Sequence, residues 1–351
     1  MKRKVFFIIS SLSAGGAQRV FWLVSQYFNH SLFDVSIVLL DSTRSFFSHE
    51  IEGVTIIDLK TKKASLSFFK LYNLIKAEKP YAVFSTGGHI DTLVSFTSLF
   101  VKIPLIIARP TNVTDKERFS NAKSKFLGKI SSKFYQHFDV IVCQSDEIRN
   151  SYYKKCKIDW EKLVIIPNPV IETKFLRTIV SDNQKIRLIV VARLTEQKGL
   201  RRLINIMKDL PSNYHLTIAG DGPLRSEILE QIELLRIQDR VQTLGTVNNV
   251  IDLIAEHNLF VLPSFIEGFP NVVIESLSVG TPVVSFEVGG INEIIQNDFN
   301  GFIVEQGNID SMKAHIIQAC FKKWDSCAIQ EDVKARFGIK KVVGYYEKLI
   351  A

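Results

Sequence analysis

Short apolar runs alternate with longer amphipathic segments through the first half of the chain. The runs are rich in valine, isoleucine, leucine and phenylalanine, which is typical of strands buried on both faces of a parallel sheet. They occupy residues 5–10, 35–40, 82–85, 104–108, 140–144 and 163–167. The segments 17–29 and 66–79 between them have the length of helices. This half therefore predicts a parallel sheet with helical crossovers.

The same rhythm restarts after residue 170. Further apolar runs occupy residues 186–192, 215–220, 241–245, 259–264, 282–286 and 301–304. Two sets of six candidate strands predict an α/β protein with two doubly wound, Rossmann-like domains. The connector lies near residues 166–175, where Pro167 and Pro169 stiffen a polar stretch. Because doubly wound sheets bind ligands beyond the carboxyl ends of their strands, functional residues are expected in the loops that follow strands.

The composition is that of an ordinary globular protein. Of 351 residues, 46% are hydrophobic and 23% are charged. The four cysteines form no CxxC pair, which argues against a disulfide framework or a zinc site. The apolar stretch at residues 5–9 is shorter than the core of a signal peptide and predicts a first strand instead. No later run has the length of a membrane helix, and the expected location is the cytoplasm.

A glycine pair follows the first predicted strand. In "SAGGAQR", Gly15 and Gly16 would let backbone N–H groups approach an anion at the start of a helix. The stretch matches neither GxGxxG nor a Walker loop. A tight turn without a ligand explains the glycines equally well.

Two cations open the second half. In "VARLTEQKGL", Arg193 ends a predicted strand and Lys198 precedes Gly199. Arginine as a fork and lysine as a point charge could together hold a diphosphate. Taken alone, each is more often a solvated loop charge. Two further strand ends, in "AGDGPLR" and "LGTV", place Asp221 as a helix cap and Thr246 where its backbone could face a ligand's base.

The stretch "EGFPNVVIES" carries two carboxylates at a loop-to-helix junction. Glu267 lies on the loop, and Glu275 lies within the following helix. The N–H groups of residues 268–272 at the helix start could bind an anion, and carboxylates accept hydrogen bonds from vicinal hydroxyls. A ligand with both phosphates and hydroxyls is a nucleotide sugar. For a single glutamate, stabilisation of the helix dipole would be the simpler explanation.

Together these stretches resemble glycosyltransferase family 4, whose members are retaining enzymes of the GT-B fold. The resemblance rests on "GGAQR", "ARLTEQKG", "AGDGPLR" and "EGFPNVVIE", which occur in the family's order over nearly the whole chain. In the GT-B fold the last helix often returns to the first domain. The resemblance thus implies an acceptor domain of residues 1–170 with a helix at about 338–351, and a donor domain of residues 171–337.

The resemblance also implies a role for each motif residue. Arg193 and Lys198 would neutralise the donor diphosphate, and Glu267 would contact the donor sugar. Glu275 would bind the ribose. The remaining donor-binding candidates are Gly15, Gly16, Gly268, Phe269, Asn271, Val272 and Thr246. Such enzymes need no cofactor and no divalent metal, since cations and helix dipoles stabilise the leaving group.

One position departs from the family pattern. Many relatives carry a histidine after the fourth strand of the first domain, and Pro110 stands near that position in "IIARPTN". Arg109 and Asn112 could take over the role, or His89 in "STGGHID" could do so. A lone histidine is more often structural, and the details on the acceptor side are therefore open.

The basic excess lies in the first half. Residues 1–170 contain 24 lysines and arginines against 14 acidic residues. Segment 116–138 joins lysines and phenylalanines at three- and four-residue steps, which predicts a basic amphipathic helix. A core-facing helix with a solvated face would show the same pattern. Together with the basic first half and "SFFK" at 67–70, this pattern leads us to expect contact with an anionic membrane surface. Nucleic acid is disfavoured because no binding fold accompanies the charge.

The leading hypothesis is a metal-independent sugar transferase of bacterial surface-glycan assembly. It would move a hexose or N-acetylhexosamine from a nucleotide-diphosphate donor, which we expect to be UDP-linked, to a glycan acceptor such as a polyprenyl-diphosphate-linked glycan. One alternative is a nucleotide-sugar epimerase of similar fold. Another is a non-catalytic partner subunit, which should have lost the donor motifs that this chain retains.

Overall fold

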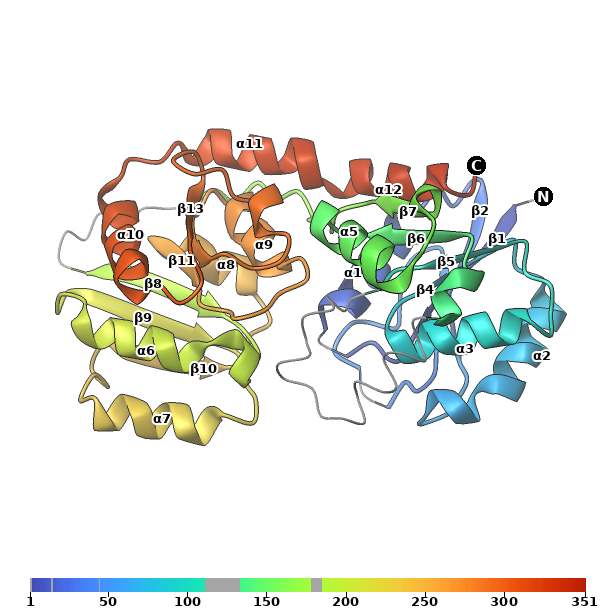
Figure 1. Ribbon diagram of the computed structural model, residues 1–351, viewed down its shortest axis with the longest axis horizontal. Coiled ribbons are helices and arrows are strands. Elements are labelled where there is room, and N and C mark those ends of the chain that lie inside the picture. Colours follow the sequence, from blue (N-terminus) through green and yellow to red (C-terminus); the bar gives the residue numbers. More distant parts are fainter. Residues whose placement is uncertain (1, 14, 44, 111–132, 178–184) are drawn as a thin grey trace. The chain divides into compact units, whose positions relative to one another are not determined.

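The protein folds into two compact units. The computed structural model describes residues 2–13, 15–43, 45–110, 133–177 and 185–351. Unit 1 comprises Met1–Pro169 together with Ile339–Ala351, and unit 2 comprises Val170–Gly338. Each unit contains one parallel sheet with helices on both faces, so the predicted pair of Rossmann-like α/β domains is confirmed (Figure 1).

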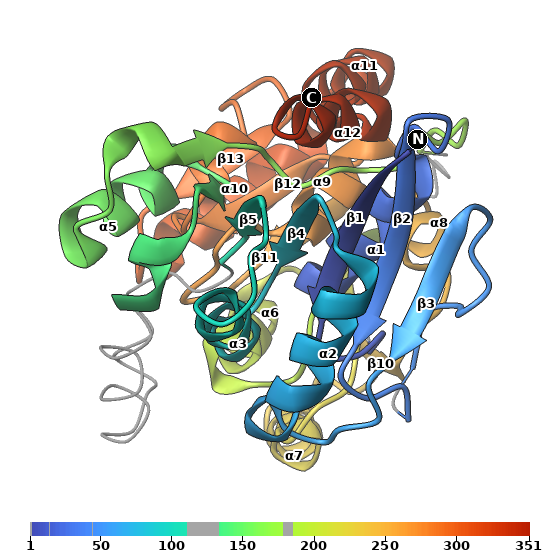
Figure 2. The same cartoon turned by 90° about the vertical axis from the view of Figure 1, so that its right-hand side faces the viewer.

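Unit 1 is built on a seven-stranded sheet within the described residues. Its strand order is β3-β2-β1-β4-β5-β6-β7, and every neighbouring pair is parallel. Figure 2 shows the part from β3 to β5. The strands are β1 (Arg3–Ile9), β2 (Phe33–Leu39), β3 (Val54–Asp58), β4 (Ala82–Ser85), β5 (Leu105–Ala108), β6 (Val140–Cys143) and β7 (Leu163–Ile165). The described helices are α1 (Gly16–Tyr27), α2 (Phe68–Glu78), α3 (Gly88–Ser98), α5 (Asp146–Cys156) and α12 (Ile339–Lys348), with short 3₁₀ turns η1 (Ala64–Leu66), η3 (Tyr135–His137) and η4 (Trp160–Lys162).

The sequence pattern missed one strand of this sheet. β3 pairs with β2 at the sheet edge, and all its residues are at least partly exposed. An edge strand needs apolar residues on fewer of its positions than a central strand does. Its segment therefore contains no continuous apolar run, although Ile56 and Ile57 stand in the middle of it.

Alternate residues of β1 serve the two faces of the sheet. Phe6 and Ile8 join the core beneath α2, α3 and α5. Phe7 points the other way and stacks on Phe84 of β4, with ring centroids 4.8 Å apart. Tyr346 of α12 completes this second face, 5.7 Å from the Phe84 ring. The carboxyl-terminal helix is thus part of the hydrophobic core of unit 1.

A buried polar group lies on the other face of the same sheet. Asp91 of α3 is 1% exposed and accepts hydrogen bonds from Ser85 Oγ (2.7 Å) and Tyr135 OH (2.8 Å). Burial raises the pKa of Asp91 to about 7, although these bonds and the charge of Arg109 act in the opposite direction. The carboxyl group therefore ties α3 to strand β4 and to η3.

Unit 2 is built on a six-stranded sheet, again counted over the described residues. Its order is β10-β9-β8-β11-β12-β13. The strands are β8 (Ile186–Val191), β9 (Tyr214–Ala219), β10 (Val241–Gly245), β11 (Leu259–Leu262), β12 (Val283–Phe286) and β13 (Gly301–Val304). The helices are α6 (Leu200–Asp209), α7 (Arg225–Leu234), α8 (Val250–Ala255), α9 (Asn271–Ser278), α10 (Ile309–Phe321) and α11 (Ser326–Phe337), with 3₁₀ turns η5 (Glu196–Lys198) and η6 (Ile291–Glu293).

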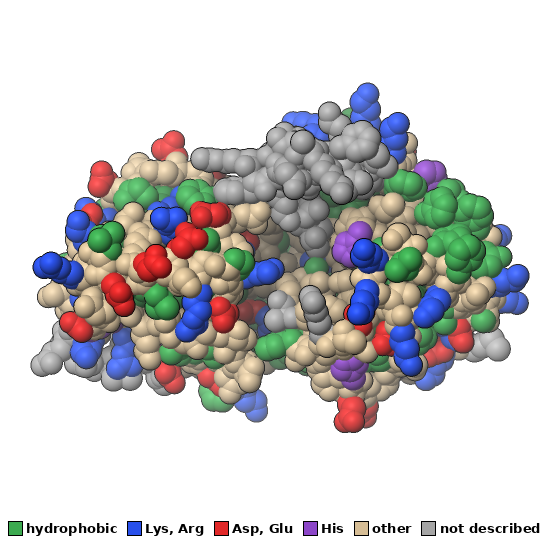
Figure 3. All heavy atoms as spheres, turned by 90° about the horizontal axis from the view of Figure 1, so that it is seen from below, with side chains coloured by type: hydrophobic (Ala, Val, Ile, Leu, Met, Phe, Trp, Pro, Cys, Tyr) green, Lys and Arg blue, Asp and Glu red, His purple; other side chains and the backbone are tan. Residues whose placement is uncertain are grey.

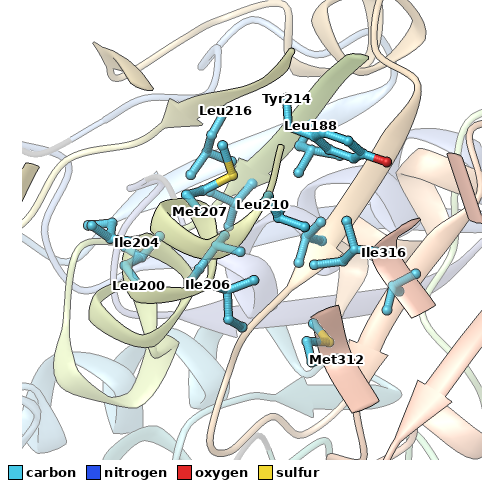
Figure 4. Packing of buried hydrophobic residues seen from close by; sticks show 14 of the residues in the cluster. Leu188, Leu200, Ile204, Ile206, Met207, Leu210, Tyr214, Leu216, Met312 and Ile316 are labelled. Atoms are coloured by element: carbon cyan, nitrogen blue, oxygen red, sulfur yellow. The ribbon is translucent and has the colours of Figure 1, made fainter. Parts of the chain in front are cut away.

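Two apolar layers cover the sheet of unit 2. Leu188 and Val190 pack with α6, α7 and α10, as Figure 4 shows for part of the layer. Ile189 between them faces α8, α9 and α11. The period of two within one apolar run confirms that these strands are buried on both sides.

Every helix in the part of the chain that the structure describes is too short or too polar to span a bilayer. The larger part of segment 116–138, residues 116–132, lies outside the described residues. Its end contains η3, in which Tyr135 is buried.

We expect Tyr346→Ala to destabilise unit 1 by about 3 kcal/mol or more, because it removes a fully buried aromatic ring from a packed core. Urea denaturation measures the effect. Tyr345→Ala, a change of the half-buried tyrosine next to it, is the matched control and should cost roughly 1 kcal/mol or less. Equal losses in both variants would show that the ring does not hold α12 to the sheet.

The free energy of unfolding of unit 1 should fall as pH rises between 5 and 7. In that range folded Asp91, with its pKa raised to about 7, keeps a proton that the unfolded chain has already lost. Asp91→Asn should flatten this slope in urea denaturation at several pH values. Asp159→Asn removes an exposed acid of the same unit and should leave the slope unchanged. A slope that survives in Asp91→Asn would contradict the assignment.

Candidate functional site

The topology of unit 2 brings two loops together. After β8 the chain forms β9 and β10, which extend the sheet toward one edge. It then returns to form β11, which pairs with β8 on its opposite side. The loops after β8 and β11 therefore leave the carboxyl edge side by side, at the switch point where α/β sheets bind ligands. The first loop carries Lys198 and the second carries Glu267.

Lys198 and Glu267 form an ion pair across this point. Lys198 Nζ lies 2.7 Å from Glu267 Oε1 and 2.9 Å from Oε2. Buried Ser264 donates a third hydrogen bond, 2.6 Å long, to Oε1. The Glu267 side chain is only 11% exposed, so the paired cation and the hydroxyl compensate for its lost hydration. The arrangement holds a carboxylate and an ammonium group in fixed positions.

Arg202 of α6 fixes the loop that carries Glu267. Its Nε donates to Pro263 O at 2.6 Å, and its NH2 donates to Ser264 O at 2.5 Å. The guanidinium carbon lies 4.0 Å from the Phe265 ring centroid and 3.8 Å from that of Phe286. Burial lowers the pKa of Arg202 to about 10, which still leaves it charged at neutral pH. A planar fork between two rings leaves these carbonyls little freedom.

Gly199 allows the two loops to approach. It has φ +63°, and a Cβ atom there would lie 2.0 Å from Pro263 O. Any side chain at this position would separate η5 from the end of β11. The "KG" pair is thus explained by geometry, because the lysine supplies the charge and the glycine supplies the space.

Helix α9 begins at Asn271, shortly after Glu267. Pro270 is its N-cap, and Asn271 and Val272, both half-buried, form its first turn. Phe269 is buried and meets Phe337 edge-on at 6.0 Å. Glu275, one turn further along α9, is only 4% exposed.

The other donor candidates of unit 2 lie at strand ends. Arg193 follows β8 and has an exposed side chain. Thr246 follows β10 and is exposed as well. Leu194 N donates to Asp221 O, which joins the loops after β8 and β9. The structure therefore brings Lys198 and Glu267 into contact, whereas Arg193 and Thr246 share only the carboxyl edge.

The sequence argument missed residues that shape this site. Gly289 and Gly290 follow β12, and Cβ atoms on them would lie 2.5 Å from Glu267 O and 2.8 Å from Gly268 O. The glycine pair in "EVGGI", directly after a predicted strand, was a readable signal of the kind used for Gly15. Ser264 and Arg202 gave no such signal, since their roles depend on contacts remote in sequence.

The glycine loop of unit 1 begins α1. Gly15 is the N-cap, and its N–H already donates to Ser13 O at 2.7 Å. Gly16 is exposed at the first helical position. Burial lowers the pKa of Arg19 in the first turn. The loop follows β1 at the carboxyl edge of the sheet, beside the end of the parallel strand β4, and this is the switch point of the sheet.

The acceptor-side candidates fall in different environments. His89 is exposed and lines a pocket of about 410 Å³ with Asp41, Lys62 and Lys63, at the carboxyl ends of the first strands. Arg109 is 2% exposed and donates to Asn168 Oδ1, with buried Pro110 after it. Asn112 lies outside the described residues.

Two family models match this chain. The model described as "Glycosyltransferase Family 4" matches residues 14–174, and the one described as "Glycosyl transferases group 1" matches residues 172–328. Together they span residues 14–328, a range that contains Gly15, Gly16, Arg193, Lys198, Glu267 and Glu275.

Known proteins of the same kind are similar over most of their length. The UDP-Gal:alpha-D-GlcNAc-diphosphoundecaprenol alpha-1,3-galactosyltransferase of Escherichia coli is 25% identical over 84% of this chain and 82% of its own. A Campylobacter jejuni alpha-1,4-N-acetyl-D-galactosaminyltransferase, named for a diNAcBac-PP-undecaprenol-linked substrate, is 28% identical over 86% of this chain and 84% of its own. Anabaena HepE, solved with UDP and glucose, shares the fold with a TM-score of 0.84, at 18% identity and 99% coverage of both chains.

Both family matches agree with the sequence motifs and with the two Rossmann-like units. The chain therefore belongs to glycosyltransferase family 4 and is a glycosyltransferase with the GT-B fold.

Proposed function

We propose that this glycosyltransferase moves a hexose or N-acetylhexosamine from a UDP-sugar to a lipid-diphosphate-linked glycan, with retention of anomeric configuration. The observation that carries the proposal is the Lys198–Glu267 pair at the switch point of unit 2. It combines a cation for the donor phosphates with a carboxylate for the sugar hydroxyls.

The pairing leaves Lys198 able to act on a donor. An ammonium group has three N–H donors, and two of its contacts are to the two oxygens of Glu267. A third N–H can meet a phosphate oxygen while the ion pair persists. Glu267 Oε2 likewise keeps capacity to accept a sugar hydroxyl. We infer that the pair orients both side chains before the donor arrives, which lowers the cost of ordering them.

The proposed reaction occurs on one face of the sugar. The bond from the anomeric carbon to the diphosphate oxygen breaks, and a bond to the acceptor hydroxyl oxygen forms on the same side. The acceptor proton passes to the departing phosphate oxygen. Lys198 and Arg193 stabilise the negative charge that develops there, and in this proposal no resident metal is needed.

The other motif residues complete the proposed donor site. The N–H groups of Gly268, Phe269, Asn271 and Val272 precede or begin α9, where the helix dipole favours an anion. Glu275 would bind the ribose and Thr246 would face the base. Gly15 and Gly16 remain candidates from unit 1.

The names of the relatives support the choice of substrates. The E. coli relative is named for UDP-Gal and a diphosphoundecaprenol acceptor, and the C. jejuni relative is named for a PP-undecaprenol-linked one. Both come from bacteria, and the proposed setting is bacterial surface-glycan assembly. A lipid-linked acceptor places the enzyme at the cytoplasmic surface of a membrane, where a basic first half favours anionic lipids. His89, Arg109 and Asn112 remain the acceptor-side candidates.

The donor is tested by thermal shift against UDP-, GDP-, ADP- and CMP-linked sugars. We expect UDP-sugars to raise the melting temperature, because a ligand of the folded state stabilises it. Lys198→Ala should weaken donor binding by about tenfold to a hundredfold, because it removes a hydrogen bond from a charged donor and this is the usual contribution of such a bond to the binding constant. Lys208→Ala, an exposed lysine of the same unit, is the control.

No shift with any donor would contradict the donor site and favour a non-catalytic partner subunit. A shift followed by conversion of the donor without acceptor would favour an epimerase. Transfer to a lipid-diphosphate glycan, with the product's anomeric configuration read by NMR, tests the remainder of the proposal.

Arg202→Lys should lower kcat by roughly tenfold, because a point charge cannot hold both carbonyls of the loop or stack between the two rings. Arg240→Lys is a matched control, since Arg240 also donates to three carbonyls in unit 2, those of Met207, Leu210 and Pro211. Both variants should lose stability, and only Arg202→Lys should lose kcat. Equal kinetic effects in steady-state assays would show that Arg202 has no positioning role.

A further inference from the structure

One face of unit 1 carries an exposed apolar patch. Figure 3 shows hydrophobic side chains gathered over α2 and α3, with basic side chains around them. We define the aromatic patch as Leu66, Phe69, Phe96, Leu99 and Phe100, which are 66%, 74%, 40%, 55% and 58% exposed. They come from η1, α2, α3 and the turn after α3.

The aromatic rings of the patch form one packed cluster. Phe68 lies at its centre, with ring centroids 5.2 Å from Phe69, 5.2 Å from Phe96 and 5.5 Å from Phe100. Phe96 and Phe100 are 5.1 Å apart. Single exposed apolar residues are normal, but contiguous ones of this kind mark an interaction surface.

Basic residues predominate around the patch. Segments 60–78 and 88–104, which supply it, contain six exposed lysines: Lys60, Lys62, Lys63, Lys70, Lys76 and Lys102. Their acidic residues are Glu78, the exposed last residue of α2, which pairs with Lys4, and Asp91, which is buried against Ser85 and Tyr135. An exposed apolar centre with a mainly cationic margin complements an apolar layer under an anionic surface.

We propose that the aromatic patch is the surface by which the enzyme docks on an anionic lipid bilayer. Phe69, Phe100 and Leu66 enter the region between headgroups and acyl chains, and the lysines contact lipid phosphates. The inference rests on the proposed function, since an enzyme with a lipid-anchored acceptor works at the bilayer surface. The sequence prediction assigned this contact mainly to segment 116–138, with the stretch 67–70 as added support, whereas the proposal assigns it to η1, α2 and α3.

The patch is continuous with the pocket of unit 1. Lys62, Lys63, Ala64 and Ser65 line that pocket, and Leu66 follows them directly. A bilayer at the patch thus lies next to the carboxyl edge of the sheet. A charged acceptor headgroup leaving the bilayer would meet the two lysines and His89 first.

Sedimentation with vesicles tests the proposal on the full-length protein. Phosphatidylcholine vesicles with and without phosphatidylglycerol are compared at low and high salt. We expect binding only with phosphatidylglycerol, weakened by salt. Phe69→Ser combined with Phe100→Ser should reduce partitioning by about tenfold or more. Phe321→Ser, at 75% exposure in unit 2, is the matched control and should bind as the unchanged protein does.

A charge variant tests the margin of the patch. Lys63→Glu with Lys102→Glu should abolish the preference for phosphatidylglycerol, whereas Lys154→Glu with Lys208→Glu, two exposed lysines elsewhere, should keep it. A Phe69/Phe100 variant that sediments like the unchanged protein overturns the proposal. So does the absence of all vesicle binding, or a concentration-dependent dimer that this variant abolishes.

The donor assay separates this inference from the proposed function. The Phe69/Phe100 variant should keep the UDP-sugar thermal shift, because neither residue lies in unit 2. Loss of vesicle binding with an intact donor response supports the patch. An intact donor response without any membrane binding overturns the patch alone, and the lack of a donor response in the unchanged protein overturns the proposed function.

Discussion

The burial of parallel strands on both faces is the constraint on which the rest of the protein depends. Parallel neighbours need crossover connections that return the chain to the edge where each strand begins, so all strands of one sheet end at the same edge. In unit 2 this edge receives Lys198 after β8 and Glu267 after β11. The two residues are far apart in sequence and 2.7 Å apart in space, and the strand order alone makes them neighbours.

The position of Glu267 is fixed by neighbouring residues that are not expected to touch a substrate. Arg202 binds the carbonyls that precede Glu267, Gly199 leaves room for that strand end, and Ser264 donates to the carboxylate. Each of these contacts limits how Glu267 can move. Catalytic geometry is sensitive to displacements of the order of 1 Å, which gives such support a direct influence on rate.

Much of this could be predicted from the sequence, because burial leaves a readable trace. Strands covered on both faces, such as β8 and β11, appear as continuous apolar runs. Edge strand β3 does not, since its positions are partly exposed. Glu267 and Lys198 could be selected from the sequence as suited to bind a sugar and a phosphate, but their contact could not be derived from their spacing in the chain.

The role of Arg202 could not be predicted either, because nothing near it in the sequence distinguishes it from Arg201, which is exposed. The stretch "SFFK" indicated one part of the aromatic patch, whereas the other part comes from α3, which is distant in the sequence.

Unit 2 has a consequence for how such enzymes diversify. Its chain is continuous from Val170 to Gly338, while unit 1 is assembled from both ends of the protein. The two ends of unit 2 also meet, since Val170 N donates to Phe337 O at 2.9 Å and Val170 pairs with Gly338. A module whose ends touch can be exchanged as a single cassette without opening the host core. Recombination at these two points would join an existing unit 1 to a different unit 2 in one step.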